Sequence, residues 1–305
     1  MNINHKFAAI DIGTNAVRLL LYNIYLDLTG VPVFKKIALT RVPIRLGEDV
    51  FATNRISDSK IELLRKTMIA FKNLIEVHDV IDYMACATSA MREAENSKEV
   101  QAFLKETTGI EITTISGEVE ADLIYQNHIA ESMNPSRAYL YIDVGGGSTE
   151  ITLFYQGEKR LSESYQIGTV RMLHDKIAKE TWDLLKIKCI EIAHRYKNII
   201  GIGSGGNVIK LQKLAGGDEG TPITRSQLKQ AHQDLSELTY EERMRKYGLN
   251  PDRADVIVPA AEIFLFITKH TEIKNILVPK MGLSDGIIHY MYDEYLKKDK
   301  NFLGH

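Results

Sequence analysis

The stretch YLYIDVGGGSTEITLFY, residues 139–155, decides the fold. An apolar, β-prone run ends in Asp143, three glycines follow at residues 145–147, and a second β-prone run occupies residues 151–155. This pattern predicts two strands joined by a tight turn. Because glycine has no Cβ atom, the backbone N–H groups of such a turn can approach an anion closely.

Polar side chains surround the same turn. Ser148 and Thr149 add hydroxyl groups, and Asp143 and Glu150 place a carboxylate on each side. Anion donors beside hard oxygen ligands are what a phosphate with Mg²⁺ requires. A tight hairpin with exposed acids is the alternative interpretation of this turn.

A second stretch, FAAIDIGTNAVRLLLY at residues 7–22, repeats the pattern. An apolar run ends in Asp11, a short turn follows at residues 13–15, and another apolar run begins at Val17. Asp11 and Asp143 therefore occupy equivalent places. Such an internal repeat predicts two similar halves that close on one phosphate cleft.

Composition limits the function classes. The chain has 305 residues, 44% of them hydrophobic, and a net charge of −2, so no global field favours nucleic acid and no nucleic-acid partner is expected. Cys86 and Cys189 stand in apolar contexts, which predicts buried thiols in a reducing compartment. Since no apolar run reaches ~18 residues, we expect no membrane partner and a cytoplasmic location.

Two further segments carry an arginine after a turn. A strand at residues 80–87 leads into TSAMRE with Arg92, and IGTVR ends in Arg171. Helix N-termini bind anions and arginine binds phosphate through two N–H groups, so both turns are phosphate candidates. For the first turn, a Ser/Thr cap beside a solvated Arg92 is the alternative.

The segment SGEVEA, residues 116–121, opens a helix predicted to continue to about residue 130. Ser116 is a candidate cap, and Glu118 and Glu120 would favour the helix dipole. Dipole stabilisation alone explains both acids, so a catalytic role needs support from other motifs.

The segment IIGIGSGG, residues 199–206, has the spacing G-x-G-x-x-G. A dinucleotide site would also need a strand that ends in an acid about 20 residues further on. A polar, glycine-rich loop follows instead. We therefore favour a backbone loop that touches phosphate or ribose, with a plain strand–helix turn as the alternative.

Turn-forming and helix-capping residues mark the boundaries in the rest of the chain. Asn134-Pro135-Ser136 predicts the domain junction, and capping boxes begin helices at Thr224 and Thr239. GLSDG, residues 282–286, is interpreted as a turn before a final helix at residues 287–296.

Taken together, the motifs resemble the exopolyphosphatase/guanosine-pentaphosphate phosphatase (Ppx/GppA) family. The matching segments, in family order, are DIGTN, ATSAMREA, ISGEVEA, YIDVGGGSTE, GIGSGGN and GLSDG. The resemblance implies an α/β fold with two ribonuclease-H-like lobes of the acetate kinase–sugar kinase–Hsp70–actin superfamily around a cleft. Residues 1–132 and 133–305 are the expected lobes.

The resemblance also implies residue roles. Glu120 matches the catalytic general base, and Asp143 and Glu150 match acids that bind Mg²⁺ or position water, with Asp11 as a further metal ligand. The implied phosphate-binding residues are Gly13, Thr14, Asn15, Arg92, Gly145, Gly146, Gly147, Ser148 and Thr149. Candidates for a more distal phosphate are Arg45, Arg171, Gly205 and Gly206.

The chain departs from the family pattern at several positions. Val119 replaces one acid of a glutamate pair, and Ala16, Asn207 and Ser284 replace residues common in the family. The chain ends at His305, so the C-terminal HD-type domain of longer members is expected to be absent. We hypothesise that the protein prefers short polyphosphate chains or acts distributively.

The reaction expected is Mg²⁺-dependent release of terminal phosphate from inorganic polyphosphate or guanosine pentaphosphate. Two alternatives remain open. One is a small-molecule kinase of the same fold, and the other is a catalytically weak polyphosphate- or nucleotide-binding regulator. The resemblance further suggests a homodimer.

Overall fold

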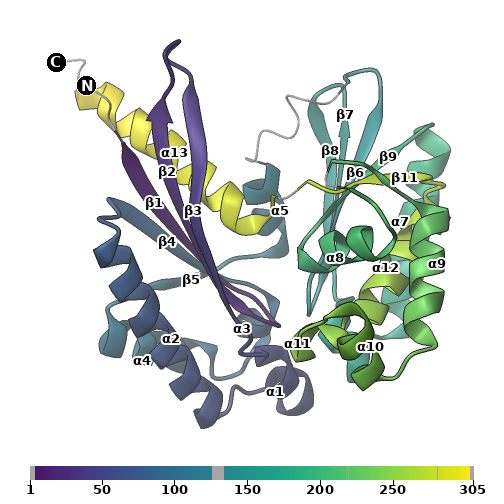
Figure 1. Ribbon diagram of the computed structural model, residues 1–305, viewed down its shortest axis with the longest axis horizontal. Helices are drawn as coiled ribbons and strands as arrows, with labels where there is room; N and C mark the ends of the chain where they lie inside the picture. Colours follow the sequence, from purple (N-terminus) through teal and green to yellow (C-terminus); the bar gives the residue numbers. More distant parts are fainter. Residues whose placement is uncertain (1–3, 126–133, 219, 280, 303–305) are drawn as a thin grey trace. The chain divides into compact units, whose positions relative to one another are not determined.

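The computed structural model describes residues 4–125, 134–218, 220–279 and 281–302. The chain divides into two compact units (Figure 1). Unit 1 comprises residues 1–127 with 282–305, and unit 2 comprises residues 128–281. The boundary expected between residues 132 and 133 lies outside the described residues.

Unit 1 is built on a five-stranded mixed sheet with the strand order β3-β2-β1-β4-β5. The first three strands pair antiparallel, and β4 and β5 continue in parallel from β1. Every residue from Phe7 to Ile12 is buried, because both faces of the sheet are covered. The strands are β1 (His5–Ile12), β2 (Val17–Leu26), β3 (Pro32–Val42), β4 (Asp82–Ala87) and β5 (Ile112–Thr114).

The described helices of unit 1 come from both ends of the chain. They are α1 (Leu46–Thr53), α2 (Asp58–Val77), α3 (Ser89–Glu93), α4 (Ser97–Thr108), α5 (Gly117–Tyr125) and α13 (Leu283–Phe302). Helix α2 packs against α4, whereas α13 packs against α5 and along β1 and β2 (Figure 1).

Unit 2 repeats the core of unit 1. Its sheet has the order β10-β11-β9-β6-β7-β8, in which β8-β7-β6-β9 corresponds to β3-β2-β1-β4 of unit 1. The internal repeat predicted from the two hairpins is therefore confirmed. The strands are β6 (Ala138–Val144), β7 (Thr149–Tyr155), β8 (Glu158–Tyr165), β9 (Ile200–Ser204), β10 (Ile223–Thr224) and β11 (Asn275–Leu277).

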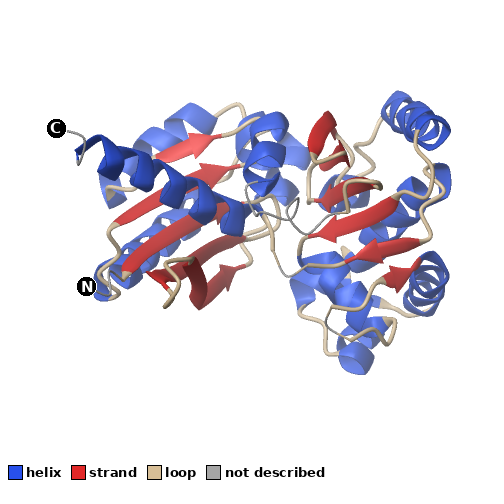
Figure 2. Ribbon diagram, turned by 90° about the horizontal axis from the view of Figure 1, so that it is seen from above, coloured by secondary structure: helices blue, strands red, loops and turns tan. Residues whose placement is uncertain are grey.

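Helix α12 (Ile257–His270) is central to unit 2 and contacts α6, α7, α8 and α9. Its inner face, with Ile263, Phe264 and Ile267, is fully buried in the core. Figure 2 shows the helices of this unit around its sheet. The other helices are α6 (Thr169–Leu173), α7 (Lys179–Arg195), α8 (Gly206–Leu214), α9 (Arg225–Ser236), α10 (Tyr240–Tyr247) and α11 (Pro251–Ala254).

Several local predictions are confirmed. Thr224 and Thr239 form complete capping boxes at the starts of α9 and α10. Cys86 and Cys189 are both buried free thiols. Across the described residues, no helix combines the length and apolar character that crossing a membrane requires.

The C-terminal segment differs from expectation in two ways. Residues 282–305 belong to unit 1 rather than to the second lobe, and α13 begins at Leu283 instead of after residue 286. Phe7 of β1 packs edge-on against the ring of Tyr292. Asp285 accepts a hydrogen bond from the Tyr22 hydroxyl at 2.8 Å and pairs with Lys36 at 3.1 Å. Periodicity shows that a helix has an apolar face, but not which sheet that face covers.

Gly286 lies inside this helix because α13 approaches α5 too closely for a side chain. A Cβ atom on Gly286 would lie 1.9 Å from the backbone oxygen of Leu123 in α5. Contact with a backbone atom cannot be relieved by a rotamer change. The glycine therefore sets the packing of the helix that carries Glu120.

We expect Gly286→Ala to lower the free energy of unfolding by about 3 kcal/mol, the scale of severe overpacking. Urea denaturation would measure the change. Gly282→Ala is the matched control, since a Cβ there meets nothing within 4 Å. Equal stability of the two variants would contradict the close packing of α13 on α5.

Candidate active site

The glycine turn of unit 2 joins β6 to β7. Strand register places Asp143 opposite Glu150 and Val144 opposite Thr149. The turn closes with a hydrogen bond from the Gly145 N–H to the Ser148 oxygen at 2.9 Å. The sequence motif thus forms the predicted hairpin.

The hairpin of unit 1 has the same turn geometry. The Gly13 N–H donates to the Ala16 oxygen at 3.1 Å, and a Cβ on either Gly13 or Gly145 would lie 3.0 Å from the equivalent carbonyl oxygen. The repeat therefore extends from sequence pattern to backbone conformation.

The two hairpins differ in the residue opposite the aspartate. In unit 1 that residue is Arg18, whose Nη1 lies 2.6 Å from Asp11 Oδ2. In unit 2 the residue opposite Asp143 is Glu150. The charge of Asp11 is compensated within its own hairpin, whereas unit 2 gathers two carboxylates that favour a bound cation.

Two serines orient the Glu150 carboxylate. Ser148 Oγ and Ser164 Oγ donate to Glu150 Oε1 at 2.7 and 2.8 Å. Ser164 lies opposite Glu150 on β8. Sequence reasoning missed this residue, because the local motif does not show the register of β7 against β8 that brings Ser164 to Glu150.

The turn between β9 and α8 approaches Asp143. Ser204 is opposite Asp143 in the sheet, and a Cβ on Gly205 would lie 3.2 Å from Asp143 Oδ1. Gly205 has φ 92°, a conformation that favours glycine. The buried hydroxyl of Ser204 has no hydrogen-bond partner among the described residues. Gly205 thus belongs to the surroundings of Asp143.

The neighbouring Gly206 makes a different contact. Arg253 of α11 donates through Nη1 to the Gly206 oxygen at 2.8 Å. Sequence reasoning missed Arg253 as a support of this turn, because nothing in its local motif points to a residue 47 positions away.

The carboxylates of Asp143 and Glu150 fit Mg²⁺ as a pair of ligands that water and substrate would complete. No cluster of three or more His, Cys, Asp or Glu side chains suited to a metal occurs within the described ranges. Mg²⁺, however, is usually bound by one or two carboxylates together with water and substrate phosphate. The Asp143–Glu150 pair beside the glycine turn offers the two carboxylates of such a set.

Helix α6 donates hydrogen bonds to the carbonyl oxygens of the glycine turn. The N–H groups of Thr169 and Val170 donate to the oxygens of Gly145 and Gly146 at 3.0 and 2.8 Å. Arg171 Nε donates to the Gly147 oxygen at 2.8 Å. In a trans peptide the N–H points opposite to the carbonyl. The N–H groups that follow these carbonyls therefore point away from α6, where an anion can approach.

Two expected phosphate ligands take part in this support. Arg171 is 6% exposed and binds the turn, and the fully buried Thr149 donates its hydroxyl to the Ile167 oxygen at 2.6 Å. The structure shows both residues shaping the loop. Their direct contact with phosphate stays a prediction.

In unit 1, the hairpin is hydrogen-bonded to two neighbouring turns. Thr14 Oγ1 hydrogen-bonds with Ser89 Oγ at 2.8 Å, and the Arg45 N–H donates to the Asn15 oxygen at 3.1 Å. The Arg45 side chain binds Glu48 at 2.5 Å. Thr14, Asn15 and Arg45 are thus brought together, and Ser89 joins them without having been singled out in the sequence.

Arg92 connects this region to the helix of Glu120. Its Nη1 donates to the Ile115 oxygen at 2.8 Å. The next residue, Ser116, caps α5, because its Oγ accepts from the Val119 N–H at 3.2 Å. The predicted cap is confirmed. Glu120 itself is 9% exposed.

Cys86 is a buried thiol of β4 beside the acids of unit 1. It stands beside Asp11 in the sheet. Burial first, and then the negative charges of Asp11 and Glu120, raise the pKa of its thiol to about 12. Asp11 and Glu120 therefore both act on the Cys86 thiol.

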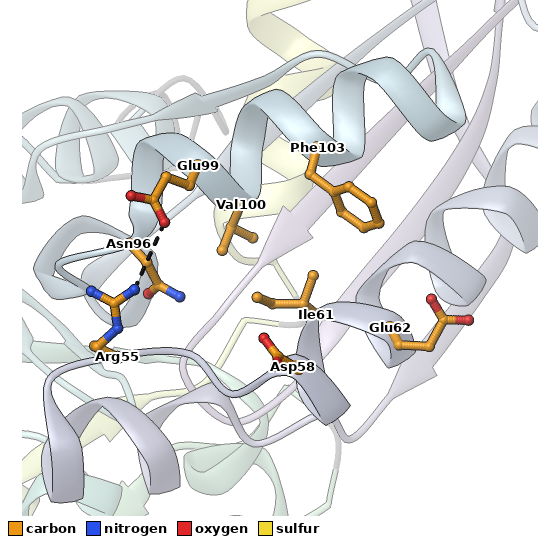
Figure 3. A pocket seen from close by; sticks show the side chains of 8 residues that line it. All are labelled: Arg55, Asp58, Ile61, Glu62, Asn96, Glu99, Val100 and Phe103. Atoms are coloured by element: carbon orange, nitrogen blue, oxygen red, sulfur yellow. Dashed lines mark ion pairs between the residues drawn. The ribbon is translucent and has the colours of Figure 1, made fainter.

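A pocket between α2 and α4 is separate from these residues. Ile61, Val100 and Phe103 line it, and Arg55 pairs with Glu99 at its rim at 3.7 Å (Figure 3). None of the candidate site residues lines this pocket.

The thiol pKa generates a labelling prediction. Because Cys86 ionises near 12 when folded, against its usual 9.0, it should stay protonated and unreactive towards iodoacetamide at pH 8 until the chain unfolds. The same preference for the protonated thiol makes stability fall as pH rises from 9.0 towards 12. Mass spectrometry with and without urea would detect the label, and fast reaction of the folded protein would contradict the burial.

Gly168 provides a test of the loop support. A Cβ there would lie 2.4 Å from the Gly146 oxygen. We expect Gly168→Ala to displace the glycine turn and weaken tripolyphosphate binding at least ~10-fold, since the N–H groups lose their alignment. Calorimetric titration would measure the affinity, with Gly282→Ala as the control. Unchanged affinity would show that the turn does not bind the anion.

Comparison with known proteins identifies the family of the chain. Residues 27–295 match the model of the Ppx/GppA phosphatase family. The chain is 26% identical to "Exopolyphosphatase 2" of Mycobacterium tuberculosis over 92% of this chain and 97% of that protein. It is 23% identical to "Exopolyphosphatase 1" of Mycobacterium bovis over 93% and 87%.

Solved structures show the same fold. A Ppx/GppA family member of Aquifex aeolicus superposes with a TM-score of 0.74 at 25% identity, covering 97% of this chain and 99% of that one. An exopolyphosphatase of Cytophaga hutchinsonii gives 0.79 at 21% identity, with 95% and 98% covered. The fold is α/β, with two ribonuclease-H-like units of the acetate kinase–sugar kinase–Hsp70–actin superfamily. The chain belongs to the Ppx/GppA phosphatase family.

Proposed function

We propose that this protein is a phosphoanhydride hydrolase that releases terminal phosphate from inorganic polyphosphate. The observation that carries the proposal is the triple-glycine turn with Asp143 and Glu150 paired across its strands. Relatives named exopolyphosphatase that align along nearly the whole chain support it. Guanosine pentaphosphate has the same kind of terminal bond and is the second substrate to test.

The glycine turn supplies the first requirement of the reaction, which is to bind and orient a phosphate group. Its N–H groups point away from α6 and can donate to phosphate oxygens. Because α6 and Arg171 hold the turn in place, little reorganisation is needed when the anion binds.

The acids of unit 2 supply the second requirement. Asp143 and Glu150 would hold Mg²⁺, which would neutralise charge on the phosphates and orient the terminal group. Ser148 and Ser164 keep the Glu150 carboxylate in one orientation by donating to it. Asp11 as a further metal ligand is a part of this proposal that rests on the family pattern.

Glu120 supplies the third requirement, a base for the attacking water. It lies in the first turn of α5 and is buried, whereas Val119 is 45% exposed. The departure at Val119 therefore leaves the buried carboxylate in place. This favours a hydrolase over a regulator that only binds its ligand.

We expect Glu120→Gln to reduce turnover by about 10² or more, the scale of losing a general base, while the protein stays folded. Phosphate release should be followed with Mg²⁺ on short polyphosphate, long polyphosphate and guanosine pentaphosphate. The exposed Glu118 on the same helix gives the matched control, Glu118→Gln.

The controls separate the competing functions. Chelation of the divalent ion should abolish release by the wild-type protein. Near-normal turnover of Glu120→Gln would remove the assignment of the base. Phosphate transfer from ATP to an added acceptor, without hydrolysis, would indicate a kinase instead.

A further inference from the structure

A basic pocket lies at the end of the unit 2 sheet opposite the glycine turn. Tyr155, Arg160, Arg195, Tyr196 and Lys197 line it, and its volume is about 540 Å³. Tyr155 is the last residue of β7 and pairs with the first residue of β6, whereas the glycine turn joins the other ends of these strands. Seven residues of β6 separate the two places by roughly 20 Å.

Three cations converge on the basic pocket from two elements. Arg160 comes from β8, and Arg195 and Lys197 come from the end of α7 and the residues after it. Among the residues that the structure describes, no acidic side chain lines the pocket. This local positive charge contrasts with the net charge of −2 of the whole chain, so the basic pocket can attract an anion that the molecule as a whole does not.

Arg195 and Lys197 retain N–H groups that can bind a ligand. Lys197 donates to the Ala193 oxygen at 3.1 Å, which uses one of its three N–H groups. The Arg195 guanidinium lies over the ring of Tyr196 at 5.6 Å. Among the residues with described positions, no carboxylate lies within ion-pairing distance of either one, and only Arg160 is paired, with Glu158 at 2.9 Å.

Capping of α7 explains these charges only in part. Cations in the last turn of a helix interact favourably with its dipole, which accounts for Arg195. Lys197 follows the helix and donates to the Ala193 oxygen in that last turn. Capping does not account for Arg160, which belongs to a strand. The rings of Tyr155 and Tyr196 meet edge-on at 5.2 Å and line the pocket beside the three cations.

We propose that the basic pocket is a second anion site, which binds a short chain of phosphates apart from the glycine turn. Several cations around one hollow match a ligand with successive negative groups better than a single small anion. The chain can be inorganic or the phosphate chain of a nucleotide. The proposal concerns binding alone and does not depend on hydrolysis at the glycine turn.

A footprint on lysine tests the proposal directly. Lys197 is compared with Lys246, which is also exposed and lies over the neighbouring ring of Tyr247 at 5.3 Å. Lys246 belongs to the last turn of α10 and lines no part of the basic pocket. The Glu120→Gln protein is acetylated with and without tripolyphosphate and analysed by mass spectrometry. We expect acetylation of Lys197 to slow about ten-fold and that of Lys246 to stay unchanged. Equal effects on both lysines would overturn the proposal.

Variants give the second test. Arg195→Glu with Lys197→Glu should remove one tripolyphosphate binding event in calorimetry, whereas Arg245→Glu with Lys246→Glu should remove none. Retention of all binding events in the first variant would refute the site. Protection of Lys197 by tripolyphosphate but not GTP would identify an inorganic chain as the ligand, and protection by both would identify the phosphate chain that they share.

The two proposals fail in different ways. If the wild-type protein released no phosphate but Lys197 were still protected, the hydrolase assignment would fail and the second site would stand. If phosphate release were normal in wild-type protein and Lys197 were unprotected, only the second site would fail.

Discussion

The hydrogen bonds from α6 to the glycine turn are the contacts on which the candidate site depends. A turn of three glycines is the most flexible backbone that a chain can make, and flexibility opposes tight binding of a phosphate. Backbone donors at Thr169 and Val170 and the buried Arg171 side chain fix its carbonyls. The N–H groups opposite those carbonyls are thereby oriented before a ligand arrives, so the site is pre-organised by its own fold.

The repeated hairpin has diverged in charge rather than in shape. Both copies keep the aspartate and the same turn hydrogen bond, but one places an arginine and the other a glutamate opposite that aspartate. Asp11 is therefore paired with Arg18 at 2.6 Å, while Asp143 and Glu150 together favour a cation. Equivalent backbones can thus serve different purposes, because one cross-strand pair decides the local electrostatics.

Sequence reasoning found the principal polar residues but not all of their structural roles. Asp143, Glu150 and Ser148 lie together as the motif predicts, since strand pairing follows directly from a tight turn. Arg171 and Thr149 were expected to bind phosphate, and the structure shows them supporting the loop. Ser164 and Arg253 were missed because their partners are distant in sequence, and a local pattern carries no information about such contacts.

The sequence by itself determined the two hairpins, the capped helices and the buried thiols, because each depends on local backbone preference and apolar periodicity. Only the tertiary structure decided that α13 packs in unit 1, that Gly286 lies inside it, and that Arg160 and Lys197 share one pocket. These features depend on which surfaces meet when the chain folds. A contact such as Gly286 against Leu123, between residues far apart in the sequence, is set by packing and not by neighbouring residues.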